Sequence, residues 1–229
     1  MLSDGPATAA VQADGQLRAA LKDGALWIEM SSVKPGEARA QAEDLGSLGV
    51  GHLDAPVSGG TRGAEAGTLA IMAGGPAGAF GRAAPVLQAM GRPVHVGPSG
   101  AGQLAKLANQ AIVAVTIGAV AEAMFLIEQG GGDPAAVRQA LQGGFADSVI
   151  LQQHGERMTT RDFVPGGLVK FQIKDLENVL AEAEGLGLRL PVSQHIRDRF
   201  VRLRDDMAGG EMDHSALFVE LLDQNGMKP

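Results

Sequence analysis

The chain has 229 residues, of which 45% are hydrophobic and 20% charged, so it can bury a sizeable core in one large domain or two small ones. A formal net charge of −7 argues against a nucleic-acid partner, because phosphate binding requires a basic face. The absence of cysteine excludes disulfides, thiolate catalysis and Cys-ligated metals, and it fits a reducing cytoplasm.

Strands and helices alternate in the pattern of the first hundred residues. Short apolar runs predict strands over Ala25–Ser31, Val50–Asp54, Gly67–Ala73 and Pro93–Gly97. Helices are expected over Pro35–Leu48, where a proline opens the first turn and Gly49 follows the end, and over Pro76–Met90. This alternation predicts an α/β layer with an at least partly parallel sheet.

Beyond Gly97 the pattern becomes entirely helical. The segment Gly102–Gln129 is one long helical pattern that is apolar on most of its surface, which predicts a buried helix. Asp133 and Pro134 are typical of a helix start. Further helices are expected at about residues 147–157, 168–184, 191–207 and 215–224, with no strand after residue 100. The predicted fold class is therefore α/β followed by all-α, with a long helix joining the two parts.

Neither a membrane span nor a metal site is expected. The longest uncharged apolar stretch, Ala111–Ala121, ends at Glu122 and is too short to cross a bilayer. The five histidines, at positions 52, 95, 154, 195 and 214, show no metal-ligand spacing.

A glycine-rich segment, Asp54-Ala-Pro-Val-Ser-Gly-Gly, ends the second predicted strand. Ser58, Gly59 and Gly60 can turn several backbone N–H groups towards one point, which suits a carboxylate or an oxyanion. The alternative is a turn that only reverses the chain, and the residues alone favour that interpretation.

Glycines also lead into the long helix, in Gly97-Pro-Ser-Gly-Ala-Gly-Gln-Leu-Ala-Lys. Asn109 and Gln110 follow Lys106 by three and four residues, so the three side chains share a helix face. A buried lysine can have a lowered pKa and pass a proton near neutral pH, whereas a lysine in an exposed first turn would only face solvent. The helix pattern leaves both interpretations open. The glycine spacing is no nucleotide fingerprint, because no βαβ unit accompanies it.

Two polar segments lie in the helical part. Lys174 and Asp175 occur in Ile-Lys-Asp-Leu on a predicted helix, where solvated charges are the simpler interpretation. In Asp213-His-Ser, either Asp213 or Ser215 is a candidate helix cap.

In order and spacing, these motifs resemble the β-hydroxyacid dehydrogenase family over essentially the whole chain. DAPVSGG, followed by a glycine seven residues after Gly60, resembles the family's substrate-binding signature, which implies substrate contacts at Ser58, Gly59 and Gly60. GPSGAGQLAKLAN resembles its catalytic motif, which implies that Lys106 is the catalytic lysine and that Asn109 contacts the substrate.

IKDL resembles the family's second lysine segment, which implies a cofactor or substrate contact at Lys174. KLANQ, QALQGGFADSVIL and DHSAL look specifically like tartronate semialdehyde reductases, because relatives that act on 3-hydroxyisobutyrate more often have a second Asn in place of Gln110. The resemblance implies NAD or NADP as cofactor, a small hydroxy- or oxo-acid substrate, a cytoplasmic location and a homodimer or homotetramer.

The resemblance also implies a domain division, with one large departure. A Rossmann-type domain would occupy residues 1–98, and a helical substrate and oligomerisation domain residues 99–229. Family members open with a strand–GxGxMG–helix motif that binds the pyrophosphate, and these residues lack it. Met1–Asp4 resembles a later loop of that domain, which implies cofactor contacts at Leu2 and Ser3, and Ser32 resembles another. We therefore expect a truncated Rossmann-type sheet without the residue that selects NAD or NADP.

Three functions are compatible with these observations. The first is reduction of tartronate semialdehyde to glycerate, with Lys106 as the proton donor. The second is a 3-hydroxyisobutyrate dehydrogenase-like activity. Imine reductases, which resemble this family, usually lack the catalytic lysine, so Lys106 argues against that activity. The third is a non-catalytic oligomerisation module, whose incomplete sheet would expose an edge.

Overall fold

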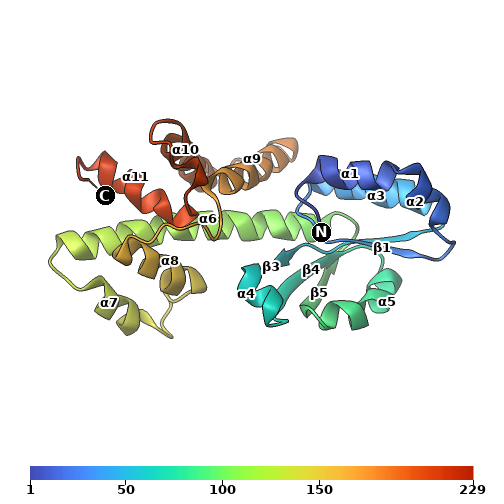
Figure 1. The fold of residues 1–229 in the computed structure, drawn as a ribbon, viewed down its shortest axis with the longest axis horizontal. Coiled ribbons are helices and arrows are strands. Elements are labelled where there is room, and N and C mark those ends of the chain that lie inside the picture. Colours follow the sequence, from blue (N-terminus) through green and yellow to red (C-terminus); the bar gives the residue numbers. More distant parts are fainter. Residues whose placement is uncertain (229) are drawn as a thin grey trace. The chain divides into compact units, whose positions relative to one another are not determined.

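The structure is a computed structural model that describes residues 1–228, and it divides into two compact units (Figure 1). The first unit, Met1–Ala108, contains every strand of the described chain, and the second unit, from Asn109 onwards, is helical. Helix α6 (Ala101–Gln129) begins in the first unit and continues in the second. The predicted order of an α/β part, a long helix and an all-α part is confirmed.

The sheet is mixed. Its strands are β1 (Leu26–Glu29), β2 (Gly51–Asp54), β3 (Val57–Ser58), β4 (Leu69–Gly74) and β5 (Gly91–Gly97). The order is β1-β2-β4-β3, and β5 also pairs with β4. Pairs β1–β2 and β4–β5 are parallel, whereas β2 and β3 both run antiparallel to β4. The four predicted strands are present, and the short β3 lies in the glycine-rich segment, where no strand was predicted.

Five helices accompany this sheet: α1 (Gly5–Ala13), α2 (Gly15–Ala20), α3 (Pro35–Gly46), α4 (Gly60–Glu65) and α5 (Ala77–Gln88). Helices α3 and α5 were predicted, whereas α1, α2 and α4 were not. The two N-terminal helices begin at side-chain caps, because Asp4 accepts the N–H of Ala7 at 2.9 Å and Asp14 accepts that of Leu17 at 2.8 Å. Helix α5 contacts the sheet, and Leu87 shares a fully buried core with Leu53.

The second unit consists of helices that match the predicted ones within a few residues. They are α7 (Pro134–Leu141), α8 (Val149–Thr160), α9 (Val169–Gly185), α10 (Pro191–Asp205) and α11 (Leu217–Gln224), with the short 3₁₀ turns η1 (Gly209–Glu211) and η2 (His214–Ala216). Their core packs Phe200 and Phe218 against Met124 of α6. A single antiparallel bridge joins Leu168 to Asp213.

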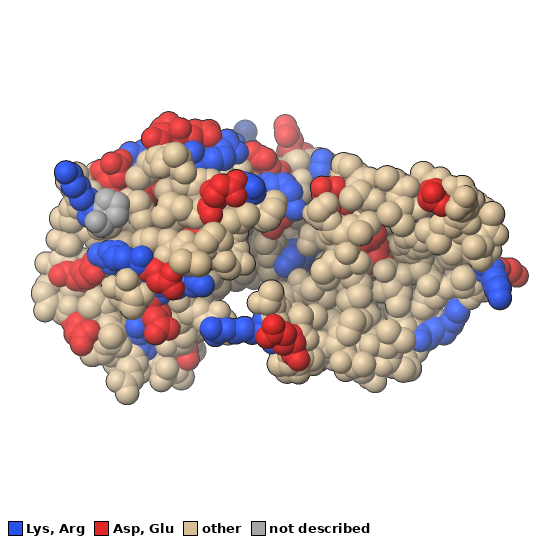
Figure 2. Space-filling model, viewed as in Figure 1, with Lys and Arg blue, Asp and Glu red and all other residues tan. Residues whose placement is uncertain are grey.

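Charged side chains of both signs mingle over the second unit in the face shown in Figure 2. Several form ion pairs between helices. The buried carboxylate of Glu220 in α11 accepts hydrogen bonds from two arginines of α10, from Arg199 Nε at 2.9 Å and from Arg202 Nη1 at 3.0 Å. These pairs satisfy a carboxylate that would be costly to bury alone, and they hold α10 to α11.

The prediction that α6 is buried is wrong for part of its surface. Ala114, Ile117, Ala121 and Met124 recur every three or four residues and are fully buried. Ile112 and Leu126 are instead 67% and 70% exposed, because the core of the described chain covers only one side of the helix. Helix α6 is long and apolar enough to cross a membrane, but core helices of soluble proteins meet the same criterion of length and composition. In its most apolar window of 18 residues, 33% of the residues are buried.

The start of α6 lies close enough to the sheet to require glycine. A Cβ at Gly102 would collide with the carbonyl oxygens of Asp54 and Met72. A Cβ at Gly74 would lie 2.6 Å from the backbone nitrogen of Gly102. These two glycines therefore allow the first turn of α6 to pack directly on the ends of β2 and β4.

We expect Gly102→Ala to lower the free energy of unfolding of the first unit by about 1–3 kcal/mol, because the backbone must shift to accept the methyl group. Gly78→Ala is the control, since nothing lies within 4 Å of a Cβ at that position of α5. Gly78→Ala should raise the free energy of unfolding by up to about 1 kcal/mol, because alanine has a higher helix propensity than glycine. Urea unfolding followed by the fluorescence of Trp27, the only tryptophan, measures both. Equal stability changes in the two variants would contradict the close packing.

Candidate active site

The predicted cofactor contacts of the first unit lie in two adjoining segments. Ser32 is half-buried in the turn that follows β1. The backbone N–H of Leu2 donates to Ser31 Oγ at 2.7 Å, which joins the N-terminal segment to this turn. Ser3 donates to Asp4 Oδ2 at 3.0 Å. The structure therefore places Leu2 beside the turn that carries Ser32, with Ser3 next to it in the chain.

Asp54, the last residue of β2, holds the first turn of α6. Its Oδ1 accepts the N–H of Gly100 at 2.8 Å, and its Oδ2 accepts the N–H of Gln103 at 2.8 Å. Burial raises the pKa of this fully buried carboxyl, and these backbone hydrogen bonds oppose the rise. No role of its own was predicted for Asp54 from the sequence, where it only began the glycine-rich segment. The available signal was a lone acidic residue at the end of an apolar strand.

Gln103 joins α6 to the turn after β1. Its Nε2 donates to the carbonyl oxygen of Ser31 at 2.8 Å, and its Oε1 accepts the N–H of Val33 at 3.1 Å. The side chain is 1% exposed. Gln103 is part of the motif that resembles the catalytic one, but the sequence predicts no role for it, because both partners lie 70 and 72 residues earlier in the chain.

Lys106 lies three residues beyond Gln103, about one helical turn further along α6. It is half-buried, which is intermediate between the two environments considered from the sequence. The first unit thus holds the proposed proton donor on a helix whose start is bonded to the turn that carries Ser32.

The segment Ser58–Gly60 forms a strand end followed by a helix start. Ser58 pairs with Ala70 of β4, and Gly59 is the N-cap of α4. Gly59 and Gly60 have φ angles of 140° and 61°, which favour glycine. Because the first N–H groups of a helix have no acceptor within that helix, this backbone suits a carboxylate ligand.

The remaining predicted residues lie in the second unit. The amide of Asn109 donates to Gln110 Oε1 at 2.8 Å, and Gln110 Nε2 donates to Asp175 Oδ2 at 2.5 Å. Lys174 Nζ lies 3.2 Å from Asp175 Oδ1. Asp175 is only 14% exposed, so it is a partnered carboxylate and not a solvated charge. Its contacts link α9, which carries Lys174, to α6, which carries Asn109.

Comparisons with known proteins identify the family. Residues 100–221 match the family model described as "NAD-binding of NADP-dependent 3-hydroxyisobutyrate dehydrogenase", and residues 1–98 match "NAD binding domain of 6-phosphogluconate dehydrogenase". Over 209 residues the chain is 44% identical to the 2-hydroxy-3-oxopropionate reductase of Escherichia coli (strain K12), which covers 91% of this chain and 71% of that protein. The chain belongs to the β-hydroxyacid dehydrogenase family.

Other members of this NAD(P)-dependent family are similar as well. The 3-hydroxyisobutyrate dehydrogenase of Pseudomonas aeruginosa is 36% identical over 76% of this chain and 61% of its own length. The solved 3-hydroxyisobutyrate dehydrogenase of Mycobacterium tuberculosis with L-serine has a TM-score of 0.85 at 30% identity, covering 96% of this chain and 77% of that one. The chain thus spans between three fifths and four fifths of these relatives, and the family's nucleotide is NAD or NADP.

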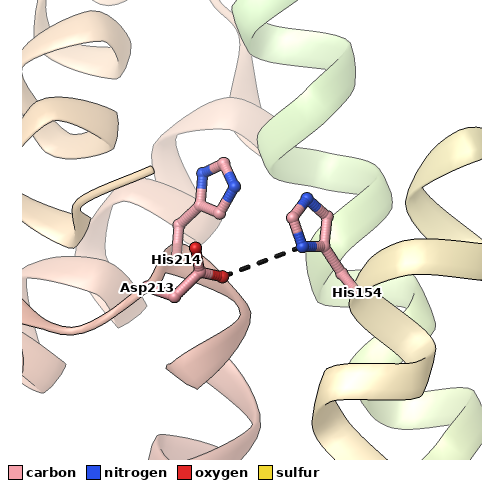
Figure 3. A group of neighbouring side chains, drawn as sticks. All are labelled: His154, Asp213 and His214. Atoms are coloured by element: carbon pink, nitrogen blue, oxygen red, sulfur yellow. Dashed lines mark ion pairs between the residues drawn. The ribbon is translucent and has the colours of Figure 1, made fainter. Parts of the chain in front are cut away.

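Outside these residues, this β-hydroxyacid dehydrogenase has a cluster of His154, Asp213 and His214 (Figure 3). Their potential ligand atoms all lie within 4.8 Å of one another. His154 Nδ1 is 3.8 Å from Asp213 Oδ1, and the two imidazole rings meet edge to face with centroids 4.6 Å apart. Linear spacing of the histidines did not reveal this cluster, because α8 and η2 are distant in sequence.

The hydrogen bonds of Asp213 argue against a cation at this cluster. Oδ1 accepts both the N–H and the hydroxyl of Ser215, at 3.0 and 2.6 Å. Oδ2 accepts the N–H groups of Gly166 and Gly167, at 2.9 and 3.0 Å, and Arg157 lies 3.4 Å away. Burial favours a raised pKa, but these hydrogen bonds outweigh it and lower the pKa of Asp213 to about 2. Of the two candidate helix caps, Asp213 and Ser215, it is Asp213 that caps the start of η2.

Two histidines, buried His52 and half-buried His154, couple the stability of the fold to pH. Burial lowers the pKa of His52, in β2, to about 4. Burial also lowers the pKa of His154 to about 4; His214 and Arg157 reinforce this effect, and Asp213 opposes it. Both side chains are therefore neutral in the folded chain at pH 7.

We expect the free energy of unfolding to decrease as the pH falls from about 6.5 towards 4. The unfolded chain protonates these histidines near their ordinary pKa of 6.5, whereas the folded chain does so only near 4, so acid favours unfolding between these values. Each of the two histidines lowers the free energy of unfolding by at most about 1.4 kcal/mol per pH unit in this range. Urea unfolding at neutral pH and one unit below 6.5 measures the loss. His52→Leu should reduce it, and exposed His195→Gln is the control; an equal loss in both variants would contradict the assignment.

Proposed function

We propose that this chain carries the catalytic part of an NAD(P)-dependent reductase of tartronate semialdehyde, the 2-hydroxy-3-oxopropionate that the similar E. coli enzyme is named for. The observation that carries the proposal is the bonded path in the first unit from the turn at Ser32, through Gln103, to the helix of Lys106. Such a path fixes a nucleotide-binding turn relative to a proton donor, as hydride transfer to a carbonyl requires.

The described residues fit one end of a dinucleotide. The turn with Ser32 lies at the carboxyl end of β1, where ligands bind in open α/β sheets, and Leu2 and Ser3 adjoin it. These groups suit the nicotinamide ribose. The strand–GxGxMG–helix motif that binds the pyrophosphate is not among the 229 residues.

When bound beside the turn at Ser32, a reduced nicotinamide would supply hydride chemistry for an aldehyde substrate. The ammonium group of Lys106 donates a proton to the developing alkoxide, and Asn109 orients that oxygen. Ser58, Gly59 and Gly60 hold the substrate carboxylate through backbone N–H groups and the hydroxyl. Lys174 contacts the cofactor or the substrate, and its ion pair with Asp175 orients it.

We further assign residues 1–98 to the nucleotide domain and residues 99–229 to the substrate and oligomerisation domain. A cytoplasmic homodimer or homotetramer is part of the same proposal and follows from the family resemblance.

A 3-hydroxyisobutyrate dehydrogenase-like activity is the second candidate. It is supported by the 36% identity to the P. aeruginosa enzyme and by the structural likeness to the M. tuberculosis enzyme. Turnover of tartronate semialdehyde, 3-hydroxyisobutyrate and related short hydroxy acids by the same preparation separates the two. A clear kcat/KM preference for 3-hydroxyisobutyrate would replace our first candidate.

We expect Lys106→Ala to lower kcat by about 10² to 10⁴-fold while leaving nucleotide affinity nearly unchanged, because it removes a proton donor and no nucleotide contact. Steady-state kinetics and a binding titration measure the two effects. Lys170→Ala is the control, since Lys170 is an exposed lysine of α9 that pairs with Glu211 of η1 at 2.7 Å. Wild-type turnover in Lys106→Ala would refute the assignment.

A calorimetric titration with NADH and with NADPH tests the chain as it stands. We expect micromolar binding of one of them if the turn at Ser32 and its neighbours form a nucleotide site. Binding of neither would favour the non-catalytic module.

A further inference from the structure

We propose that Gln103 is a positioning residue that clamps the Ser31–Val33 turn onto the helix of Lys106. The inference deepens the proposed function and depends on it for its catalytic meaning. We call it a positioning and not a catalytic residue, because both of its side-chain hydrogen bonds go to backbone groups of this turn.

Both ends of the Gln103 amide are used, on opposite sides of one residue. Nε2 donates to the carbonyl oxygen of Ser31, and Oε1 accepts the N–H of Val33. Ser32, the predicted cofactor contact, is the residue between these two groups. A carbonyl can only accept and an N–H can only donate, so the orientation of the amide is fixed by its partners.

The clamp is anchored on both sides. The backbone N–H of Gln103 donates to Asp54, so the residue is tied to β2 as well as to the turn. Ser31 in turn accepts the N–H of Leu2 and donates its own N–H to Glu29 Oε1 at 2.8 Å. With 1% of Gln103 exposed, water does not compete for these bonds.

Only glutamine supplies a donor and an acceptor with this reach. Leucine has a similar volume and would leave the carbonyl of Ser31 and the N–H of Val33 without their partner. Glutamate would keep the acceptor for Val33 and lose the donor for Ser31. The two substitutions therefore remove both bonds or one bond of the clamp, without creating a large cavity.

The consequence is a fixed separation between the nucleotide turn and the proton donor. Lys106 lies about 4.5 Å further along the axis of α6 than Gln103, from the rise of an α-helix. A turn held at Gln103 keeps its distance to Lys106 as the substrate is reduced. A turn released from Gln103 would bind nucleotide more weakly and present it less well to the lysine.

Hydrogen exchange of the free chain tests the clamp without any cofactor. In Gln103→Leu, amide exchange in peptides that cover Ser31–Val33 should become about tenfold faster, whereas peptides of α9 should keep the wild-type rate. Gln139→Leu, at an exposed position of α7, is the matched control. Unchanged exchange at Ser31–Val33 in Gln103→Leu would overturn the proposal.

Kinetics test what the clamp does. We expect Gln103→Leu to raise KM for the nucleotide about tenfold, lower kcat and increase the deuterium isotope effect from a nicotinamide deuterated at C4. Gln103→Glu should be at least as damaging as Gln103→Leu, because an ionised carboxylate buried at this position would face the carbonyl oxygen of Ser31 without a donor. A merely structural role would reduce the active fraction alone; unchanged KM and isotope effect would therefore overturn the positioning role. If the wild-type chain shows no turnover, the proposed function is refuted. The hydrogen-exchange measurement then still tests whether Gln103 holds the Ser31–Val33 turn.

Discussion

The interaction on which the first unit depends is the buried carboxylate of Asp54 at the start of α6. A buried carboxylate is costly unless donors surround it, and here the N–H groups of Gly100 and Gln103 lie 2.8 Å from its two oxygens. These N–H groups would otherwise be unsatisfied at a helix start. One interaction therefore satisfies both partners and places the first turns of the helix, including Lys106, relative to the sheet of the first unit.

The glycines around Asp54 make this interaction possible. Gly74 and Gly102 let β4 and the helix start approach within backbone contact, and Gly100 adopts a φ of 88° just before the helix. A side chain at Gly102 would separate the N–H groups from the carboxylate. The motif that resembles a catalytic signature is thus also a packing requirement, and its glycines serve the approach of helix to sheet.

Much of the fold could be predicted from periodicity, and its exceptions have physical reasons. The four longer strands and the helices beyond residue 130 follow from apolar patterns and caps such as Asp133. Helices α1, α2 and α4 are short and rich in glycine or alanine, so their patterns are weak. The site residues could be predicted from motifs. The hydrogen bonds that organise them could not be predicted, because Gln103 is separated from its partners Ser31 and Val33 by 72 and 70 residues.

The two buried aspartates show how surroundings, and not residue type, determine the role of a carboxylate. Burial raises the pKa of Asp54, whereas hydrogen bonds outweigh burial at Asp213 and lower its pKa to about 2. Folding therefore favours the ionised form of Asp213 and disfavours that of Asp54. Asp213 stabilises the chain as a fully partnered cap. Burial of Asp54 therefore opposes its ionisation, and the hydrogen bonds from Gly100 and Gln103 offset part of that cost while they place the start of α6.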